Sequence, residues 1–203
     1  MPGPSRAAVR AFLHRESSKP EFERRAWRVA PAFYWKPEPH ESSERKVLGP
    51  PIDAVGRAYA GPGAAAFGWY GANYLGWSRQ VAARHTYAVP GEPRLRNPLP
   101  GVRLLGRRNL ARRELTFLES TYLEATLGFD LWVETDWECE DPWGDIALAE
   151  TERLLDWRSA RGHDVPRADV FAHVAALEAP PRGLRMFRYR IDRLVAVFRS
   201  GRR

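Results

Sequence analysis

Apolar residues recur at every third or fourth position in several stretches of the chain, which is the spacing of one helical face. The clearest repeat predicts a C-terminal helix with an apolar seam formed by Leu184, Phe187, Ile191, Leu194 and Phe198. The other faces of this helix carry Arg185, Arg188, Arg190, Arg193 and Arg199. The same spacing predicts shorter helices over residues 6–16, 52–59, 115–125, 146–161 and 167–178.

Other stretches have the apolar or alternating pattern of strands. Residues 27–34 form one such stretch, and we expect two more, residues 85–89 and 102–107, to pair with each other. The strictest alternation lies in residues 131–140, where four carboxylates line one side of a predicted strand. Residues 64–75 are rich in small and aromatic side chains, and we expect a helix there that packs closely against the preceding one.

Helical and extended segments are intermixed without the strand–helix–strand rhythm or the Gly-rich phosphate loop of a doubly wound nucleotide-binding fold. The pattern predicts an α+β protein, with mixed helices and short antiparallel strands around one main core. Residues 36–51 combine prolines with charged and serine residues and are the best linker candidate. They mark the boundary between an N-terminal segment, residues 1–50, and a larger domain, residues 51–203.

The composition supports a folded protein with a large core. Of the 203 residues, 44% are hydrophobic and 12% are aromatic, with eight tryptophans. Cys139 is the only cysteine, which excludes a disulfide framework and a cysteine-based metal site and fits a reducing cytosol. The N-terminus has no long apolar segment, and the least polar stretch, residues 59–77, is interrupted by glycines and a proline. We therefore expect a cytoplasmic protein with no signal peptide and no membrane span.

The chain is cationic, with a formal net charge of +7 and a pI of about 10.0, and nearly all of its positive charge is arginine. A GC-rich genome would encode arginine in place of lysine without any functional demand. Guanidinium groups also bind phosphates and carboxylates in paired hydrogen bonds, and excess positive charge favours acidic partners. The basic segments are either a solvated surface or contacts for phosphates or an acidic partner. The candidate contact residues are Arg103, Arg107, Arg108, Arg112, Arg113, Arg199, Arg202 and Arg203.

The acidic side of residues 131–140 is the sharpest candidate for catalysis. Glu134, Asp136 and Glu138 would supply oxygen ligands to Mg²⁺ for phosphodiester chemistry. Carboxylates on an edge strand also serve as a solvated surface that resists aggregation, or as a contact for a basic partner or for the protein's own arginines. The five histidines show no paired ligand spacing, and no serine lies in a nucleophile motif. We therefore expect no catalytic residue, metal or cofactor, with a metal-dependent nucleic-acid enzyme as the alternative.

One block of the sequence resembles a known family. Residues 72–91 read Ala-Asn-Tyr-Leu-Gly-Trp-Ser-Arg-Gln-Val-Ala-Ala-Arg-His-Thr-Tyr-Ala-Val-Pro-Gly. This block is similar to the AbiEi-type antitoxins of bacterial type IV toxin–antitoxin systems, which often carry a small-residue helix ending in Ala-Ala-x-x-Leu-Gly-Leu, then Thr-x-Gln-x-Pro and a strand. Residues 28–37 resemble the wing-like strand of the family, and residues 115–119 and 178–182 are similar to weaker landmarks. The departures from the family pattern are Trp77 for Leu, Arg79 for Thr, Ala82 for Pro and Ala32 for Gly.

The resemblance implies a non-enzymatic antitoxin that counteracts a nucleotidyltransferase-type toxin, with a C-terminal domain that also assists in DNA binding. Members of the family usually begin with a complete winged helix-turn-helix, whereas residues 1–50 predict one helix and one strand, a reduced winged-helix-like segment. The expected partners are the toxin and operator DNA, which would make the protein a transcriptional regulator of its own operon. A further alternative is a protein-interaction scaffold that docks a partner on the apolar seam of residues 184–198.

Overall fold

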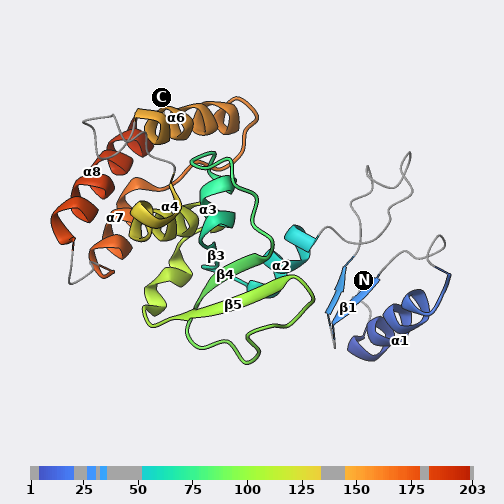
Figure 1. The fold of residues 1–203 in the computed structure, drawn as a ribbon. Helices are drawn as coiled ribbons and strands as arrows, with labels where there is room; N and C mark the ends of the chain where they lie inside the picture. Colours follow the sequence, from blue (N-terminus) through green and yellow to red (C-terminus); the bar gives the residue numbers. More distant parts are fainter. Residues whose placement is uncertain are drawn as a thin grey trace.

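The computed structural model describes residues 5–20, 27–30, 33–35, 52–133, 145–178 and 183–201. Near the N-terminus, α1 spans Arg6–Ser17 and is capped by Ser5, whose hydroxyl accepts a hydrogen bond from the Ala8 N–H. The strands β1 (Trp27–Ala30) and β2 (Phe33–Trp35) form an antiparallel pair (Figure 1). The sequence predicts a single strand in this stretch, and the structure contains two. The winged-helix assignment of this segment stays a prediction.

The main sheet contains β3 (Ala65–Ala66), β4 (His85–Pro90) and β5 (Val102–Arg107), in the order β3-β4-β5. β3 and β4 are antiparallel, whereas β4 and β5 are parallel. The pairing of β4 with β5 is confirmed, but the expected antiparallel direction is wrong. Residues 91–101 run back along the sheet, so that β5 starts beside the start of β4. A hydrogen bond from the Leu104 N–H to the Arg96 carbonyl, 2.7 Å long, ties this return segment to β5.

Small residues let β3 and α3 lie close together. The sequence predicts a helix over residues 64–75, but the structure is extended through β3, and α3 spans only Trp69–Tyr74. Gly68, with a φ of 66°, turns the chain between the two elements. A Cβ on Gly71 would lie 2.6 Å from the Ala66 carbonyl oxygen, so any side chain there would push α3 away from β3. The close approach expected between two helices is therefore an approach between a helix and a strand.

The remaining helices lie beside the sheet and make up the larger part of the molecule (Figure 1). They are α2 (Ile52–Ala60), the 3-10 helix η2 (Leu110–Glu114), α4 (Phe117–Leu127), α5 (Phe129–Trp132), α6 (Asp145–Ser159), α7 (Ala168–Ala176) and α8 (Leu184–Ser200). Together with the small mixed sheet they define an α+β protein, which confirms the predicted class. The central helix is α4, which contacts β3, α3, α5 and α8 and is buried along most of its length.

The main core lies between α4, α6, α7 and α8. Aromatic rings join its elements: Trp77 packs against Tyr122 with ring centres 5.6 Å apart, and Phe171 packs against Phe198 at 5.1 Å. A smaller apolar cluster lies on the sheet around Tyr87, which is fully buried. The chain thus has the main core that the sequence predicts, together with a second apolar layer beside it.

The apolar seam of α8 is part of the main core. Phe187, Ile191, Leu194 and Phe198 are buried, and Leu184 is partly buried. The helix and its apolar side are therefore as predicted. However, the seam packs on α4, α6 and α7, so it is not available to a partner. This burial removes the surface on which the scaffold hypothesis depends.

The alternating acidic stretch does not begin as a strand. Leu131 and Trp132 lie in α5, and the backbone becomes extended only at Val133, with φ −95° and ψ 130°. Tertiary contacts favour this helical turn, because the Trp132 indole packs against two aromatic rings of the β3–α3 segment and fills the space beside Gly128 that a side chain would need. The predicted strand is wrong for its first two residues, and residues 134–140 lie outside the described ranges.

Candidate cationic binding surface

Two buried carboxylates of α4 determine where several arginines lie, and the first is Glu119. It forms a capping box with Thr116, in which each side chain accepts a hydrogen bond from the backbone N–H of the other residue. The fully buried Glu119 carboxylate also accepts hydrogen bonds from the backbone N–H of Arg167, at 2.6 Å, and from its Nη2, at 2.7 Å. Burial acts to raise the pKa of Glu119, but the hydrogen bonds from Arg167 and Thr116 outweigh it and hold the pKa below its ordinary value. The start of α7 is thereby fixed to the start of α4.

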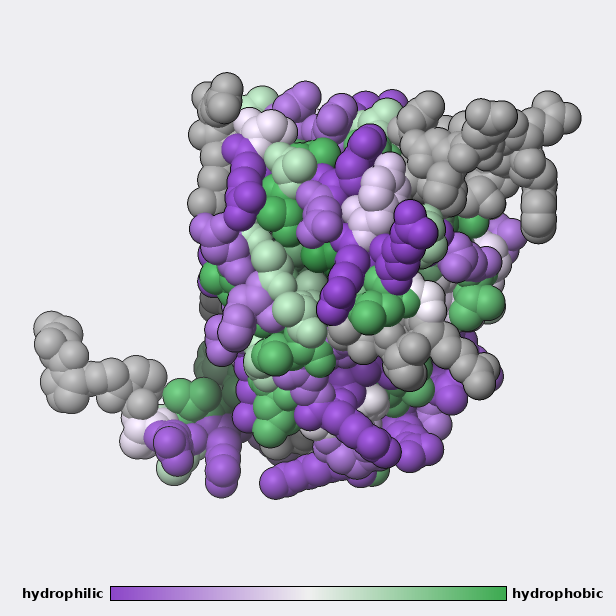
Figure 2. All heavy atoms as spheres, turned by 90° about the vertical axis from the view of Figure 1, so that its left-hand side faces the viewer, coloured by the Kyte–Doolittle hydropathy of each residue, from purple (hydrophilic) through white to green (hydrophobic). Residues whose placement is uncertain are grey.

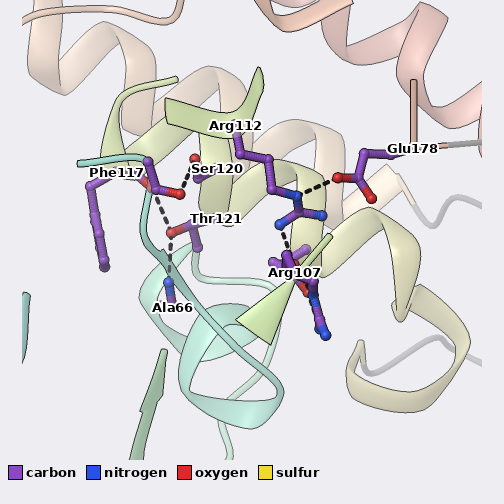
Figure 3. A network of polar contacts seen from close by, with 9 residues as sticks. Ala66, Arg107, Arg112, Phe117, Ser120, Thr121 and Glu178 are labelled. Atoms are coloured by element: carbon purple, nitrogen blue, oxygen red, sulfur yellow. Dashed lines mark hydrogen bonds and ion pairs between the residues drawn. The ribbon is translucent and has the colours of Figure 1, made fainter. Parts of the chain in front are cut away.

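The second buried carboxylate, Glu124, binds two of the candidate contact arginines. Arg107, at the end of β5, donates from Nε and Nη2 to the two oxygens of Glu124, at 2.7 and 2.8 Å. Arg112 in η2 donates from Nη1 to Glu124 and from Nε to Glu178, the latter at 2.5 Å (Figure 3). Burial acts to raise the pKa of Glu124, but the two arginines outweigh it and lower the pKa below its ordinary value. Two guanidiniums and two carboxylates make this network neutral.

The network corrects the expectation for Arg112. Its side chain is 1% exposed, so it cannot reach a phosphate or a partner surface and instead joins η2 to α4 and to Glu178, two residues past the end of α7. Arg107 is 28% exposed, and its paired donors are directed to Glu124. No local pattern in the sequence predicts these partners, because Glu124 and Glu178 are distant from the arginines in sequence and contact them only in the folded protein.

Three other candidate arginines do lie on the surface. Arg103, Arg108 and Arg113 are exposed, and none of them forms an ion pair with another residue that the structure describes. Arg103 follows the first residue of β5, and Arg108 follows its last. They are about 16 Å apart at the strand rise of roughly 3.3 Å per residue. These two cations are therefore well separated along the chain, and Arg113 belongs to a different element, η2.

The remaining candidates belong to the C-terminal end of α8. Arg199 is 65% exposed and forms an ion pair with the exposed Asp169 of α7, at 3.0 Å. Arg202 and Arg203 lie outside the described residues. Figure 1 shows β5 and α8 well apart in the molecule, with α4 between them. Among the described candidates, Arg199 therefore does not join the arginines of β5 and η2 in one continuous surface.

The outer face of α8 carries a further cationic group, absent from the candidate set. Arg185, Arg188 and Arg193 are exposed there, opposite the buried seam, and Tyr189 among them is 39% exposed. The Arg193 guanidinium lies 6.0 Å from the centre of the Tyr189 ring. Figure 2, which views this side of the molecule, shows long hydrophilic side chains projecting between exposed hydrophobic ones. The helical periodicity that predicts the seam also places these arginines on the other faces of the helix, as observed for all three.

Arg190 departs from the rest of α8. The sequence places it with the other arginines on the polar faces, but its side chain is 6% exposed. Its Nη2 donates to Asp130 at 2.6 Å, and its guanidinium lies 4.0 Å from the centre of the Phe129 ring. Arg190 therefore attaches α8 to α5 and is not part of the outer face.

A polar cluster around Asp53 joins α2 to α3 and β4. The Asp53 carboxylate accepts hydrogen bonds from Arg57 and from the hydroxyls of Tyr70 and Tyr87. Tyr87 also donates to the Asp53 backbone carbonyl, at 3.1 Å. Burial, and then the nearby Asp53 carboxylate, raises the pKa of Tyr87 far above its ordinary value. These groups satisfy one another and connect the three elements. The i,i+4 spacing of Asp53 and Arg57 points to their ion pair, but no spacing points to the two tyrosines.

The catalytic alternative is not tested by the described part of the chain. Glu134, Asp136, Glu138 and Cys139 all lie outside the described ranges, so the metal-dependent hypothesis stays a prediction. Within those ranges, no three histidine, cysteine or acidic side chains come together as a metal site would require. Among the described helices, none is both long enough and apolar enough to cross a membrane.

Comparison with known proteins finds no family model, no curated protein and no solved structure that matches this chain. The likeness of residues 72–91 to AbiEi-type antitoxins is therefore carried by sequence alone. In the structure, this block runs from α3 through β4. Its main departure, Trp77, is 2% exposed and donates from Nε1 to Thr151 Oγ1 at 3.2 Å, so it fills the core position that a smaller apolar residue would take.

Proposed function

We propose that this chain is a non-enzymatic, antitoxin-like binding protein of the AbiEi kind. It counteracts a nucleotidyltransferase-type toxin in the cytoplasm and regulates its own operon through arginine contacts with DNA. The sequence of residues 72–91 supports the choice of family. The observation that carries the binding role is that some arginines form ion pairs with buried carboxylates, whereas others are exposed.

Exposed arginines without a fixed counter-charge are well suited to an anionic partner. Arg103, Arg108 and Arg113, in β5, just after it and in η2, are exposed and form no ion pair with a described residue. A cation that has no ion pair to break can neutralise a phosphate and release its counterion, which favours binding at low salt. The formal net charge of +7 adds attraction at longer range.

A gel shift on the promoter of its own operon tests the DNA part of this proposal. We expect binding that weakens steeply as salt rises, and a smaller slope in the double variant Arg103→Ala/Arg113→Ala, by about 0.9 for each lost phosphate contact. The control is Arg161→Ala, which removes one exposed charge from the turn after α6. Absence of a shift at low salt, or equal slopes in all three proteins, rejects the DNA contact.

Growth rescue tests the antitoxin part. The product of the neighbouring gene is expressed alone and then together with this chain, and we expect the chain to restore growth if that product is a nucleotidyltransferase-type toxin. Arg103→Ala/Arg113→Ala separates the two activities, because rescue without promoter binding would show that they use different surfaces. Failure of the wild-type chain to restore growth would reject the antitoxin assignment.

A further inference from the structure

In the described part of the protein, the outer face of α8 is not used to hold the helix in the fold. The helix is held by its buried seam and by Arg190, which leaves Arg185, Arg188, Tyr189 and Arg193 exposed on the opposite side. From the first to the last of these residues the helix advances about 12 Å, at roughly 1.5 Å per residue. Over that length, one strand of a nucleic acid presents several phosphates.

A shallow depression lies on this face, at the N-terminal half of α8. It is lined by Leu184, Arg185, Arg188, Tyr189 and Asp192. Leu184, the Tyr189 ring and the aliphatic parts of the two arginines give it apolar walls, and the guanidiniums give it a cationic rim. Asp192 adds one hydrogen-bond acceptor. A ligand that suits this combination has a flat apolar part, a hydrogen-bond donor and negative charge on either side.

An unpaired nucleotide has all three features. Its base has two apolar faces that stack on tyrosine, and its phosphates pair with arginine. The amino group of cytosine, for example, donates to a carboxylate such as Asp192. A paired base cannot enter the depression, because its faces are covered by neighbouring bases and its edge by its partner. Unpaired bases that stack on aromatic side chains are the usual targets of sequence-specific recognition in RNA.

We infer that the outer face of α8 binds single-stranded RNA. Arg185, Arg188 and Arg193 pair with successive phosphates, and one base stacks on Tyr189 in the depression with its amino group donating to Asp192. This activity goes beyond the antitoxin proposal and does not depend on it, because it uses neither the β5–η2 arginines nor a toxin.

Fluorescence anisotropy with the full-length chain tests this inference. The probes are labelled 12-nucleotide oligo(C) and oligo(U) RNAs, the oligo(C) DNA of the same length, and a double-stranded RNA. We expect oligo(C) RNA to bind most tightly and the duplex most weakly. A salt titration of the oligo(C) RNA complex should give a slope of about −0.7 for each phosphate that is neutralised.

Variants on α8 then separate stacking from charge. Tyr189→Ala should weaken oligo(C) RNA binding about tenfold, whereas Tyr189→Phe, which keeps the ring, should stay within about twofold of wild type. Arg185→Ala/Arg188→Ala should reduce the salt slope by about 1.4. Asp192→Ala should abolish the preference for oligo(C) over oligo(U). All four positions are on the surface of the helix, and an unchanged melting temperature would confirm that each variant is folded.

The matched control is Arg84→Ala/Arg94→Ala, which removes the same charge from exposed positions before and after β4 and should leave RNA affinity within about twofold. Equal losses in this control and in Arg185→Ala/Arg188→Ala would overturn the assignment to α8, since they would indicate non-specific attraction. Duplex binding as tight as single-strand binding, or DNA preferred over RNA, would overturn the choice of ligand. Promoter binding and growth rescue are separate readouts, so failure here leaves the antitoxin proposal standing, and the reverse is also true.

Discussion

The surroundings of α4 and the outer face of α8 use the same residue type in opposite ways. Beside α4, Arg112 is 1% exposed and is bound to two carboxylates. On α8, Arg185 and Arg188 are exposed and have no ion pair with any described residue. The described arginines therefore fall into two structural classes. Some guanidiniums connect elements of the fold, and others are exposed without an ion pair to a described residue.

Removing a buried guanidinium is the strongest test of the difference between buried and exposed arginines. Arg112→Met should lower the free energy of unfolding by about 3–5 kcal/mol, because it leaves buried carboxylates short of a counter-charge. Urea denaturation followed by circular dichroism measures the change. The adjacent exposed residue gives the control, since Arg113→Met should change the stability by less than about 0.5 kcal/mol. Similar small losses in both variants would show that the network does not stabilise the fold.

Lowering the pH should also reduce the free energy of unfolding through the two buried carboxylates of α4, and this loss should be gradual. The folded protein holds the pKa of Glu119 and of Glu124 below the ordinary value of 4.5. Above that value both carboxylates are ionised in the folded and unfolded chains, and their stabilisation is complete. As the pH falls below 4.5, the unfolded chain takes up protons first and stability declines, by up to about 1.4 kcal/mol per pH unit for each group.

Urea midpoints measured between pH 7 and pH 3 test this dependence. Glu119→Gln/Glu124→Gln should be less stable at neutral pH and should lose less stability on acidification than wild type. An identical acid dependence in the two proteins would assign the effect to other carboxylates.

The capping box of α4 should contribute less. Thr116→Ala removes the hydroxyl that accepts from the Glu119 N–H, and we expect a loss of about 1 kcal/mol. Thr116→Ser retains the hydroxyl and should restore most of it. Thermal unfolding of the two variants provides the measurement. A loss that serine does not recover would point to the methyl group of Thr116 rather than to capping.

The smallest effect is expected at the exposed ion pair between α7 and α8. Arg199→Ala removes a partner of Asp169, and both side chains are well exposed, so the loss should not exceed about 0.5 kcal/mol. High salt should shrink the difference further, which chemical denaturation at two salt concentrations will detect. A loss as large as that of Arg112→Met would remove the distinction between the two classes of arginine.

Local patterns predict the helices of this protein well and its long-range contacts poorly. The repeat from Leu184 to Phe198 predicts α8 and its buried side, because burial of one helical face imposes that spacing. The direction of β5 beside β4 depends on the path of residues 91–101, which leaves no periodic signal. Likewise, α5 replaces the start of a predicted strand because Trp132 packs against rings from a distant segment.

The candidate contact residues show the same difference between local patterns, which can be predicted, and long-range contacts, which cannot. Exposure of Arg103 agrees with the alternation of β5, in which its neighbours Val102 and Leu104 are buried. Burial of Arg112 could not be predicted, because one of its partners, Glu178, is 66 positions away. The outer face of α8 follows from the same helical spacing as the seam and was within reach of sequence reasoning.

The place of α8 in the main core has a consequence for protein synthesis. Its Phe187, Ile191, Leu194 and Phe198 complete the apolar contacts of α4, α6 and α7. A nascent chain is made from its N-terminus at about 5–20 residues per second. Until Phe198 has left the ribosome, the apolar faces of the three earlier helices stay open to water. Chaperone demand should therefore peak just before α8 emerges from the ribosome, and a stop codon ahead of α8 would yield an aggregation-prone product rather than a smaller folded one.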